Sequence, residues 1–245
     1  MTIPSWPPAY PLAMLLGVIV FLVVRRIQPR SPEILALSFV QKLYLSLVAF
    51  IGGTFGSKLP FVIVTGTLFS PEGWLADGKT ITVALVGAYL AVEIAKPLLG
   101  IRLKTGDDYA LPLAAAMAIG RWGCFFNGCC YGAETSVPWA VRFETVTGWR
   151  HPVAIYESAF HLAMFLLLCV ALSRDWWPTH RLQAYLIAYC IYRWCTEFIR
   201  PEPSWAAGMT SYQWIVLGFG AALALQWWWE TRRLEHPMHV DDPAT

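Results

Sequence analysis

The chain has 245 residues, of which 57% are hydrophobic and only 14% are charged. Soluble domains carry about 25% charged residues, so this composition excludes an ordinary soluble enzyme and indicates a membrane protein. The net charge of +2 is too small to favour a nucleic-acid partner. We expect one membrane domain over residues 1–230, a short polar disordered tail at 231–245, and no cofactor.

Long apolar runs recur along the chain, and a helix needs about 20 such residues to cross a bilayer. They predict an all-α integral membrane protein with about seven transmembrane helices. After the second run, Gly52, Gly53 and Gly56 predict a bend into a re-entrant stretch near 57–69. The predicted helices span residues 9–24, 35–55, 80–98, 109–127, 152–173, 182–199 and 211–229.

The distribution of lysine and arginine predicts the orientation, because cytoplasmic loops are enriched in these residues. With the N-terminus outside, ten of the 18 basic residues fall on the inner side and five on the outer side. The C-terminus is then cytoplasmic, and the longest loop, 128–151, lies on the outer face. The inner set is Arg25, Arg26, Arg30, Lys96, Arg102, Lys104, Arg174, Arg181, Arg232 and Arg233.

Charged and titratable residues interrupt the apolar runs. A charge at the bilayer centre costs about 2.5–3.5 kcal/mol on the insertion scale, so such residues usually have a function. Lys42 and Glu93 have simpler interpretations: Lys42 reaches water from a helix end, and Glu93 pairs with Lys96. The full set is Lys42, Glu93, Arg121, Glu157, His161, Arg193 and Glu197.

Tyr189, Arg193, Glu197 and Arg200 follow one another at helical spacing and share one face of the predicted sixth helix. Two interpretations stay open. The face is either an ion-paired stripe that holds helices together or the polar wall of an internal cavity. In a cavity, the two arginines would suit a phosphate, because guanidinium groups match phosphate oxygens in pairs.

Residues 120–132 read GRWGCFFNGCCYG, with four glycines that allow turns and close backbone approach. Arg121 beside this glycine-rich break resembles a site for an anionic head group. Cys124, Cys129 and Cys130 have four interpretations: small packing residues, an outer-face disulfide, a reactive thiol near Arg121, or metal ligands together with His151. Adjacent cysteines rarely give good zinc geometry and no second C-x-x-C is present, so we expect no metal site.

Three blocks of sequence match the pattern of a known family. Residues 120–132 follow G-R-x-G-N-F-x-N-G-E-x-x-G with substitutions, and Pro138-Trp139 come after them. Residues 150–157 follow R-H-P-x-x-x-Y-E, and residues 189–200 follow Y-x-x-x-R-x-x-x-E-F-x-R. With these motifs, the chain resembles the prolipoprotein diacylglyceryl transferase family of bacteria, whose members have seven helices and an outer N-terminus. The resemblance spans nearly the whole chain.

The resemblance implies a multi-pass transferase of the bacterial inner membrane. Such an enzyme moves a diacylglyceryl group from phosphatidylglycerol to the thiol of a prolipoprotein lipobox cysteine. It implies that Arg121 and Arg193 hold the phosphate and that Glu197 positions Arg193. Other residues are implied to bind substrate by orienting the head group, guarding the outer mouth or shaping the loop: Tyr10, Lys58, Asn127, Gly132, Tyr189 and Arg200.

The chain departs from the family pattern in the half of the site that would bind the acceptor. Cys124 stands in place of the signature asparagine and Cys129 in place of the signature glutamate. The family's His-Gly-Gly motif is missing near residues 82–84, so His151 or Glu197 would have to serve as general base. A lone interfacial histidine such as His151 is also explained as a simple polar cap. Two alternatives follow: a transferase with a different acceptor, or a non-enzymatic protein that binds anionic lipid.

Overall fold

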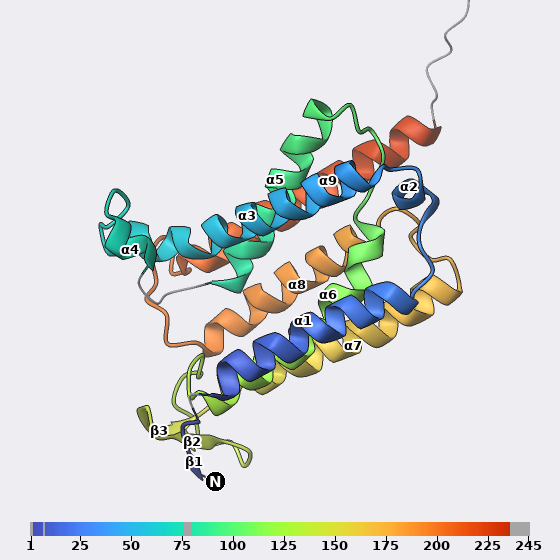
Figure 1. Ribbon diagram of the computed structural model, residues 1–245. Coiled ribbons are helices and arrows are strands. Elements are labelled where there is room, and N and C mark those ends of the chain that lie inside the picture. Colours follow the sequence, from blue (N-terminus) through green and yellow to red (C-terminus); the bar gives the residue numbers. More distant parts are fainter. Residues whose placement is uncertain (1, 7, 76–79, 236–245) are drawn as a thin grey trace, which may run out of the picture. The chain divides into compact units, whose positions relative to one another are not determined.

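The computed structural model describes residues 2–6, 8–75 and 80–235. Its helices and strands fall into two compact units, residues 27–108 and the remainder of the chain, which are described in turn (Figure 1). The long helices are α1 (Ala9–Ile27), α3 (Phe39–Val64), α5 (Ile81–Leu98), α6 (Asp107–Phe126), α7 (Val153–Ser173), α8 (Arg181–Thr196) and α9 (Ser211–Glu235). Each of the seven predicted ranges therefore corresponds to a helix.

The unit of residues 27–108 is built on the pair α3 and α5, with the short helices α2 (Pro32–Leu35) and α4 (Pro71–Leu75). A capping box of Ser38 and Gln41 starts α3, because the two side chains satisfy backbone N–H groups at the helix N-terminus. Within α5, Lys96 pairs with Glu93 at 2.5 Å, which confirms the predicted pairing.

The predicted re-entrant stretch near 57–69 is wrong, because α3 continues as a helix through the three glycines to Val64. The glycines serve packing instead. A Cβ atom at Gly56 would lie 2.5 Å from the carbonyl oxygen of Val83 on α5. Only a residue without a side chain lets the two helices approach this closely. The three glycines therefore mark a close contact between α3 and α5 and not a bend in the chain.

The other unit holds a series of packed helices, each joined to the next by small residues or polar contacts. Gly17 on α1 faces the Ala116 carbonyl of α6, and the Ser158 hydroxyl of α7 donates to the Ala118 carbonyl of α6 at 2.6 Å. The Tyr189 hydroxyl of α8 reaches α7, and Gly220 of α9 lies against Cys190 of α8. This packing brings the buried charged residues of α6, α7 and α8 close together.

A small sheet, which the all-α prediction did not include, joins the N-terminus to the loop between α6 and α7. Strands β1 (Thr2–Ile3), β2 (Val141–Phe143) and β3 (Val146–Arg150) lie in that order, with β1 parallel and β3 antiparallel to β2. The side chain of Glu144 accepts hydrogen bonds from the backbone N–H and hydroxyl of Ser5. Strands this short carry too few alternating residues to be recognised from sequence.

Five helices of the described chain are long and apolar enough to cross a membrane: α1, α3, α5, α6 and α7. On α1, Leu15, Val18 and Leu22 leave more than half of their surface exposed. Such a continuous apolar exterior suits contact with lipid rather than water. The protein is thus a mostly helical, multi-pass membrane protein.

The C-terminal helix α9 runs to Glu235, five residues beyond the predicted end of the membrane domain at residue 230. The rest of the predicted polar tail, 236–245, lies outside the described residues. The expected division into one membrane domain and a tail stays a prediction.

Candidate functional site

Glu157 is the centre of a buried ion-pair cluster between α6, α7 and the end of α8. Its Oε2 atom lies 2.7 Å from Nη2 of Arg121 and 3.0 Å from Nη2 of Arg200. Its Oε1 atom accepts a hydrogen bond of 2.8 Å from the Tyr189 hydroxyl. Only 1% of Glu157 is exposed, so the carboxylate depends on these partners for its charge compensation.

A second buried carboxylate, Glu197, lies beside the first. Oε2 of Glu197 lies 2.9 Å from Nη2 of Arg193 and 4.0 Å from Nε of Arg200, and Oε1 accepts a 3.0 Å hydrogen bond from the Thr210 hydroxyl. Arg200 therefore connects the two carboxylates. The predicted pairing of Glu197 with Arg193 is present.

The end of α8 explains how these residues meet. The α-helix stops at Thr196, and a 3₁₀ turn over Glu197–Ile199 follows. This tighter turn ends in extended backbone at Arg200, whose side chain still reaches Glu157 on α7. The predicted shared face of Tyr189, Arg193, Glu197 and Arg200 is thus assembled from a helix and its irregular end.

Aromatic rings extend the cluster along α7 and α8. His161, which has no exposed surface, pairs through Nδ1 with the Tyr185 hydroxyl at 2.8 Å, and its Nε2 lies 3.9 Å from Oε1 of Glu157. The Tyr192 ring stacks on Phe160, with 4.4 Å between ring centroids. These contacts hold the cluster in one geometry, as preorganised sites require.

The cluster gathers three guanidinium groups and has spare hydrogen-bond donors. Arg121, Arg193 and Arg200 form ion pairs with only two carboxylates, Glu157 and Glu197. Among the described residues, the buried Nε atoms of Arg121 and Arg200 and the Tyr192 hydroxyl have no hydrogen-bond partner. Buried donors without partners are unfavourable, and the oxygens of a bound anion would satisfy them.

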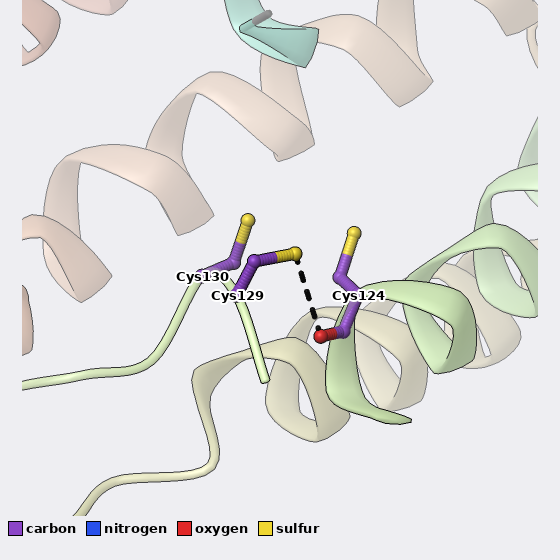
Figure 2. A group of neighbouring side chains, drawn as sticks. All are labelled: Cys124, Cys129 and Cys130. Atoms are coloured by element: carbon purple, nitrogen blue, oxygen red, sulfur yellow. Dashed lines mark hydrogen bonds between the residues drawn. The ribbon is translucent and has the colours of Figure 1, made fainter. Parts of the chain in front are cut away.

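Three cysteines lie next to this charge cluster, at the end of α6 (Figure 2). Their Sγ atoms all lie within 4.8 Å of one another, and Nη1 of Arg121 lies 3.6 Å from Sγ of Cys124. All are free thiols, so the disulfide interpretation does not describe this structure. Hydrogen bonding to Cys124 and Cys129, together with the charges of Arg121 and Arg200, holds the pKa of Cys130 below its usual range.

The remaining predicted residues lie in several places. Asn127 directly follows the last residue of α6. Tyr10 on α1 packs against a hydrophobic core cluster that contains Cys124. Gly132 is confined, since a Cβ there would lie 2.7 Å from Cβ of His151. Lys58 is buried on α3, in the other unit.

His151, the candidate base, is half-buried just before α7, and its Nδ1 lies 3.2 Å from the Tyr156 hydroxyl. Its side chain is not part of the group of three thiols. The interpretation in which His151 completes a four-ligand set with the cysteines is therefore not supported.

Sequence reasoning underestimated Glu157 and His161. Both were recognised as charged or titratable residues in an apolar run, but neither was placed in the site. A signal was present: the two residues are four apart on one helix, and Glu157 ends the R-H-P-x-x-x-Y-E block. Spacing of this kind aligns them on one face, although it cannot show that Arg121 and Arg200 converge there.

Comparisons with known proteins cover the whole site. Residues 7–229 match the family model for prolipoprotein diacylglyceryl transferase. A protein from Gloeobacter violaceus named phosphatidylglycerol–prolipoprotein diacylglyceryl transferase is 30% identical over 250 aligned positions, and the alignment covers 91% of this chain and 88% of that protein. A protein of the same name from Clostridium tetani is 34% identical over 180 residues, or 68% and 71% of the two chains.

Proposed function

We propose, because the chain belongs to the prolipoprotein diacylglyceryl transferase family, that it transfers a diacylglyceryl group from phosphatidylglycerol to the thiol of a prolipoprotein cysteine. The observation that carries the proposal is the match over residues 7–229, which includes every residue of the buried charge cluster. The curated relatives are named for this donor and this acceptor.

The charge cluster is the proposed binding site for the phosphate of the donor lipid. Arg121 and Arg193 hold the phosphate, while Glu157 and Glu197 fix the directions of the guanidinium groups by the ion pairs described above. Arg200 and Tyr189 complete the lining of this proposed phosphate site. The three guanidinium groups and the unpartnered Nε donors of Arg121 and Arg200 favour an anion over a neutral head group.

The proposed reaction is a displacement at a glycerol carbon. The acceptor thiolate forms a sulfur–carbon bond, the carbon–oxygen bond to the phosphate breaks, and glycerol phosphate leaves with the electron pair. Negative charge grows on the leaving phosphate oxygen during this step. Preorganised arginines near that oxygen stabilise the transition state more than the ground state, and this difference accelerates the reaction.

The remaining roles are assigned to residues around the loop that follows α6. Tyr10 and Asn127 orient the head group of the donor, and Gly132 lets the loop pass close to His151. A substrate-binding role of Lys58, on α3 in the other unit, stays a prediction. Glu197 is already engaged by Arg193 and Thr210, so His151 is the better candidate for accepting the thiol proton.

We also propose seven membrane crossings in the inner membrane, with the N-terminus outside and the C-terminus cytoplasmic. The five apolar helices, the positions of α8 and α9 at the two remaining predicted crossings and the asymmetry of basic residues support this topology. The loop 128–151, with Cys129, Cys130 and His151, would then open to the outer side, where a secreted prolipoprotein arrives.

The proposal is tested by transfer from phosphatidylglycerol to a lipobox peptide, using the full-length protein in detergent. We expect transfer by the wild-type chain and at least a hundredfold loss in Arg121→Ala and Arg193→Ala. Arg121→Lys keeps the charge but not the planar guanidinium and should also lose most activity. Arg142→Ala is the control, since Arg142 is exposed on β2, and should retain activity.

A second candidate function keeps the lipid donor and changes the acceptor. It is favoured by Cys124 and Cys129, which stand where the family signature has asparagine and glutamate. Lipid mass spectrometry of a deletion strain separates the two: loss of one lipid species with unaffected lipoproteins supports the second candidate. If the protein binds phosphatidylglycerol but no donor turnover occurs with any acceptor, both are wrong and a lipid-binding role remains.

A further inference from the structure

The three thiols at the end of α6 have no assigned role in the transfer reaction. Cys124 is buried and Cys129 and Cys130 are partly buried, and their sulfurs are gathered on one side of the turn (Figure 2). Within the described part of the chain they form a group with one ligand atom each, all within 4.8 Å of one another. Three thiols in such proximity are a potential binding site for a soft metal ion.

The backbone explains why residues that are adjacent in sequence come together. Gly128 has φ +67°; its N–H bonds to the Phe125 carbonyl, and the N–H of Cys129 bonds to the Cys124 carbonyl. This pair of bonds is a Schellman motif, which turns the chain back over the last helical turn. The motif therefore places Cys129 beside Cys124.

Cys130 joins them through a second unusual conformation, since its φ is +56°. A residue other than glycine in this region is uncommon and costs on the order of 1 kcal/mol or more. Ordinary packing at a Schellman motif accounts for the contact between Cys124 and Cys129 but not for the third thiol. Adjacent cysteines on regular backbone give poor metal geometry, but the two unusual conformations of this turn bring all three sulfurs within 4.8 Å of one another.

The distances suit zinc after a small adjustment. Zinc–sulfur bonds are about 2.3 Å long, so sulfurs in a tetrahedral site lie roughly 3.8 Å apart. Rotations about the Cα–Cβ bonds close a difference of about 1 Å or less. Arg121, which lies 3.6 Å from Sγ of Cys124, provides a positive charge beside a site whose three thiolates and one divalent ion carry a net negative charge.

We propose that Cys124, Cys129 and Cys130 bind a thiophilic divalent cation such as zinc, and that the fourth coordination position takes the acceptor thiol. Three protein ligands with one open position are the arrangement of catalytic zinc sites. The second half of the proposal rests on the proposed function. In a chain that lacks the His-Gly-Gly motif, the cation would act together with His151 by favouring the thiolate form of the acceptor.

The chemistry balances without a redox partner. When the acceptor sulfur binds the cation, its proton passes to His151, the base proposed above, directly or through water, and the sulfur becomes a thiolate. That sulfur then bonds to the glycerol carbon, and the carbon–oxygen bond breaks with its electrons going to the phosphate oxygen. The product thioether is a weak ligand, so it leaves the cation and the fourth position is free again.

Metal binding is tested first, on the reduced full-length protein in detergent. We expect about one zinc or cobalt ion per chain, with thiolate-to-metal charge-transfer absorption for cobalt. Cys124→Ser and Cys130→Ser should each weaken binding tenfold or more. The matched controls are Cys169→Ser and Cys195→Ser, whose thiols lie on α7 and α8 outside the group, and they should bind normally. No uptake by the reduced protein, or equal uptake by all variants, overturns the metal site.

The acceptor role is tested by adding lipobox peptides to the cobalt-loaded protein. A peptide with its cysteine should shift the cobalt spectrum, whereas the same peptide with serine should not; identical spectra overturn this half of the proposal. Chelation should reduce transfer tenfold or more and added zinc should restore it. Transfer that survives chelation overturns the acceptor role of the cation but supports the transferase. No transfer with or without zinc counts against the transferase and against the acceptor role that rests on it, whereas metal binding is decided by the uptake measurements.

Discussion

Arg121 and Glu157 form a buried ion pair between α6 and α7, with 2.7 Å between Nη2 and Oε2. Arg121 and Glu157 are only 4% and 1% exposed. Such a pair gives little net stability compared with apolar residues, but removing one partner leaves an uncompensated charge. The pair is thus better explained by a function that needs a fixed arginine than by stability.

Replacement of Glu157 by glutamine keeps the shape of the side chain and removes its charge. Arg121 and Arg200 then lose their shared counter-charge, and we expect the free energy of unfolding to fall by about 3–5 kcal/mol. Thermal or denaturant unfolding in detergent measures this loss. The control is Glu134→Gln, which breaks the pair with Arg150 at a carboxylate that is 66% exposed and should cost about 1 kcal/mol or less. Equal losses would show that charge compensation does not hold the cluster.

Tyr189→Phe tests the hydrogen bond that supports the same carboxylate. The hydroxyl donates to Oε1 of Glu157 at 2.8 Å, and hydrogen bonds to charged groups contribute about 1.5–3 kcal/mol. We expect a loss of stability in that range and a weaker affinity for phosphatidylglycerol, measured by lipid binding in detergent. Tyr44→Phe, on the exposed surface of α3, should change neither quantity. In combination with Glu157→Gln, the two losses should be less than additive, and full additivity would contradict a shared role.

The long helices could be predicted from sequence because the length of an apolar run is a local property. Each predicted range agrees with α1, α3, α5, α6, α7, α8 or α9 to within a few residues at most ends; α3 is the main exception, since it runs nine residues past the predicted end at 55. The sequence shows the glycines at 52, 53 and 56. Whether they break the helix or let another helix pack closely against it depends on the position of α5, which cannot be predicted from the residues around them.

The candidate site was predictable only in part for the same reason. The spacing of Tyr189, Arg193, Glu197 and Arg200 placed these residues together, and the structure brings them together. The position of Glu157 between Arg121 and Arg200 depends on packing between α6, α7 and α8. The gathering of the thiols depends on two backbone conformations, at Gly128 and Cys130, and the sheet depends on pairing across most of the chain.

Gly56→Ala tests the close approach of α3 and α5. The new Cβ would lie 2.5 Å from the Val83 carbonyl oxygen, so the helices must separate, and we expect a loss of about 1–3 kcal/mol from overpacking. Gly218→Ala in α9 is the matched control, because a Cβ there meets open space and alanine favours the helix by about 0.5–1 kcal/mol. Unfolding measurements should therefore give opposite signs, and a neutral Gly56→Ala would contradict the close contact.

Gly128→Ala tests the link between the turn and the cysteines. Alanine at φ +67° is strained, and its Cβ would lie 2.9 Å from the Thr145 hydroxyl, which donates to the Gly128 carbonyl. We expect about 1–2 kcal/mol of lost stability and at least a tenfold weaker affinity for cobalt, because Cys129 would no longer be held beside Cys124. Gly208→Ala carries the same backbone strain at φ +71° in open space, so it should lose similar stability but keep its metal affinity. If the two variants bind cobalt equally well, the Schellman turn does not organise the thiols, and the proposed metal site loses its structural basis.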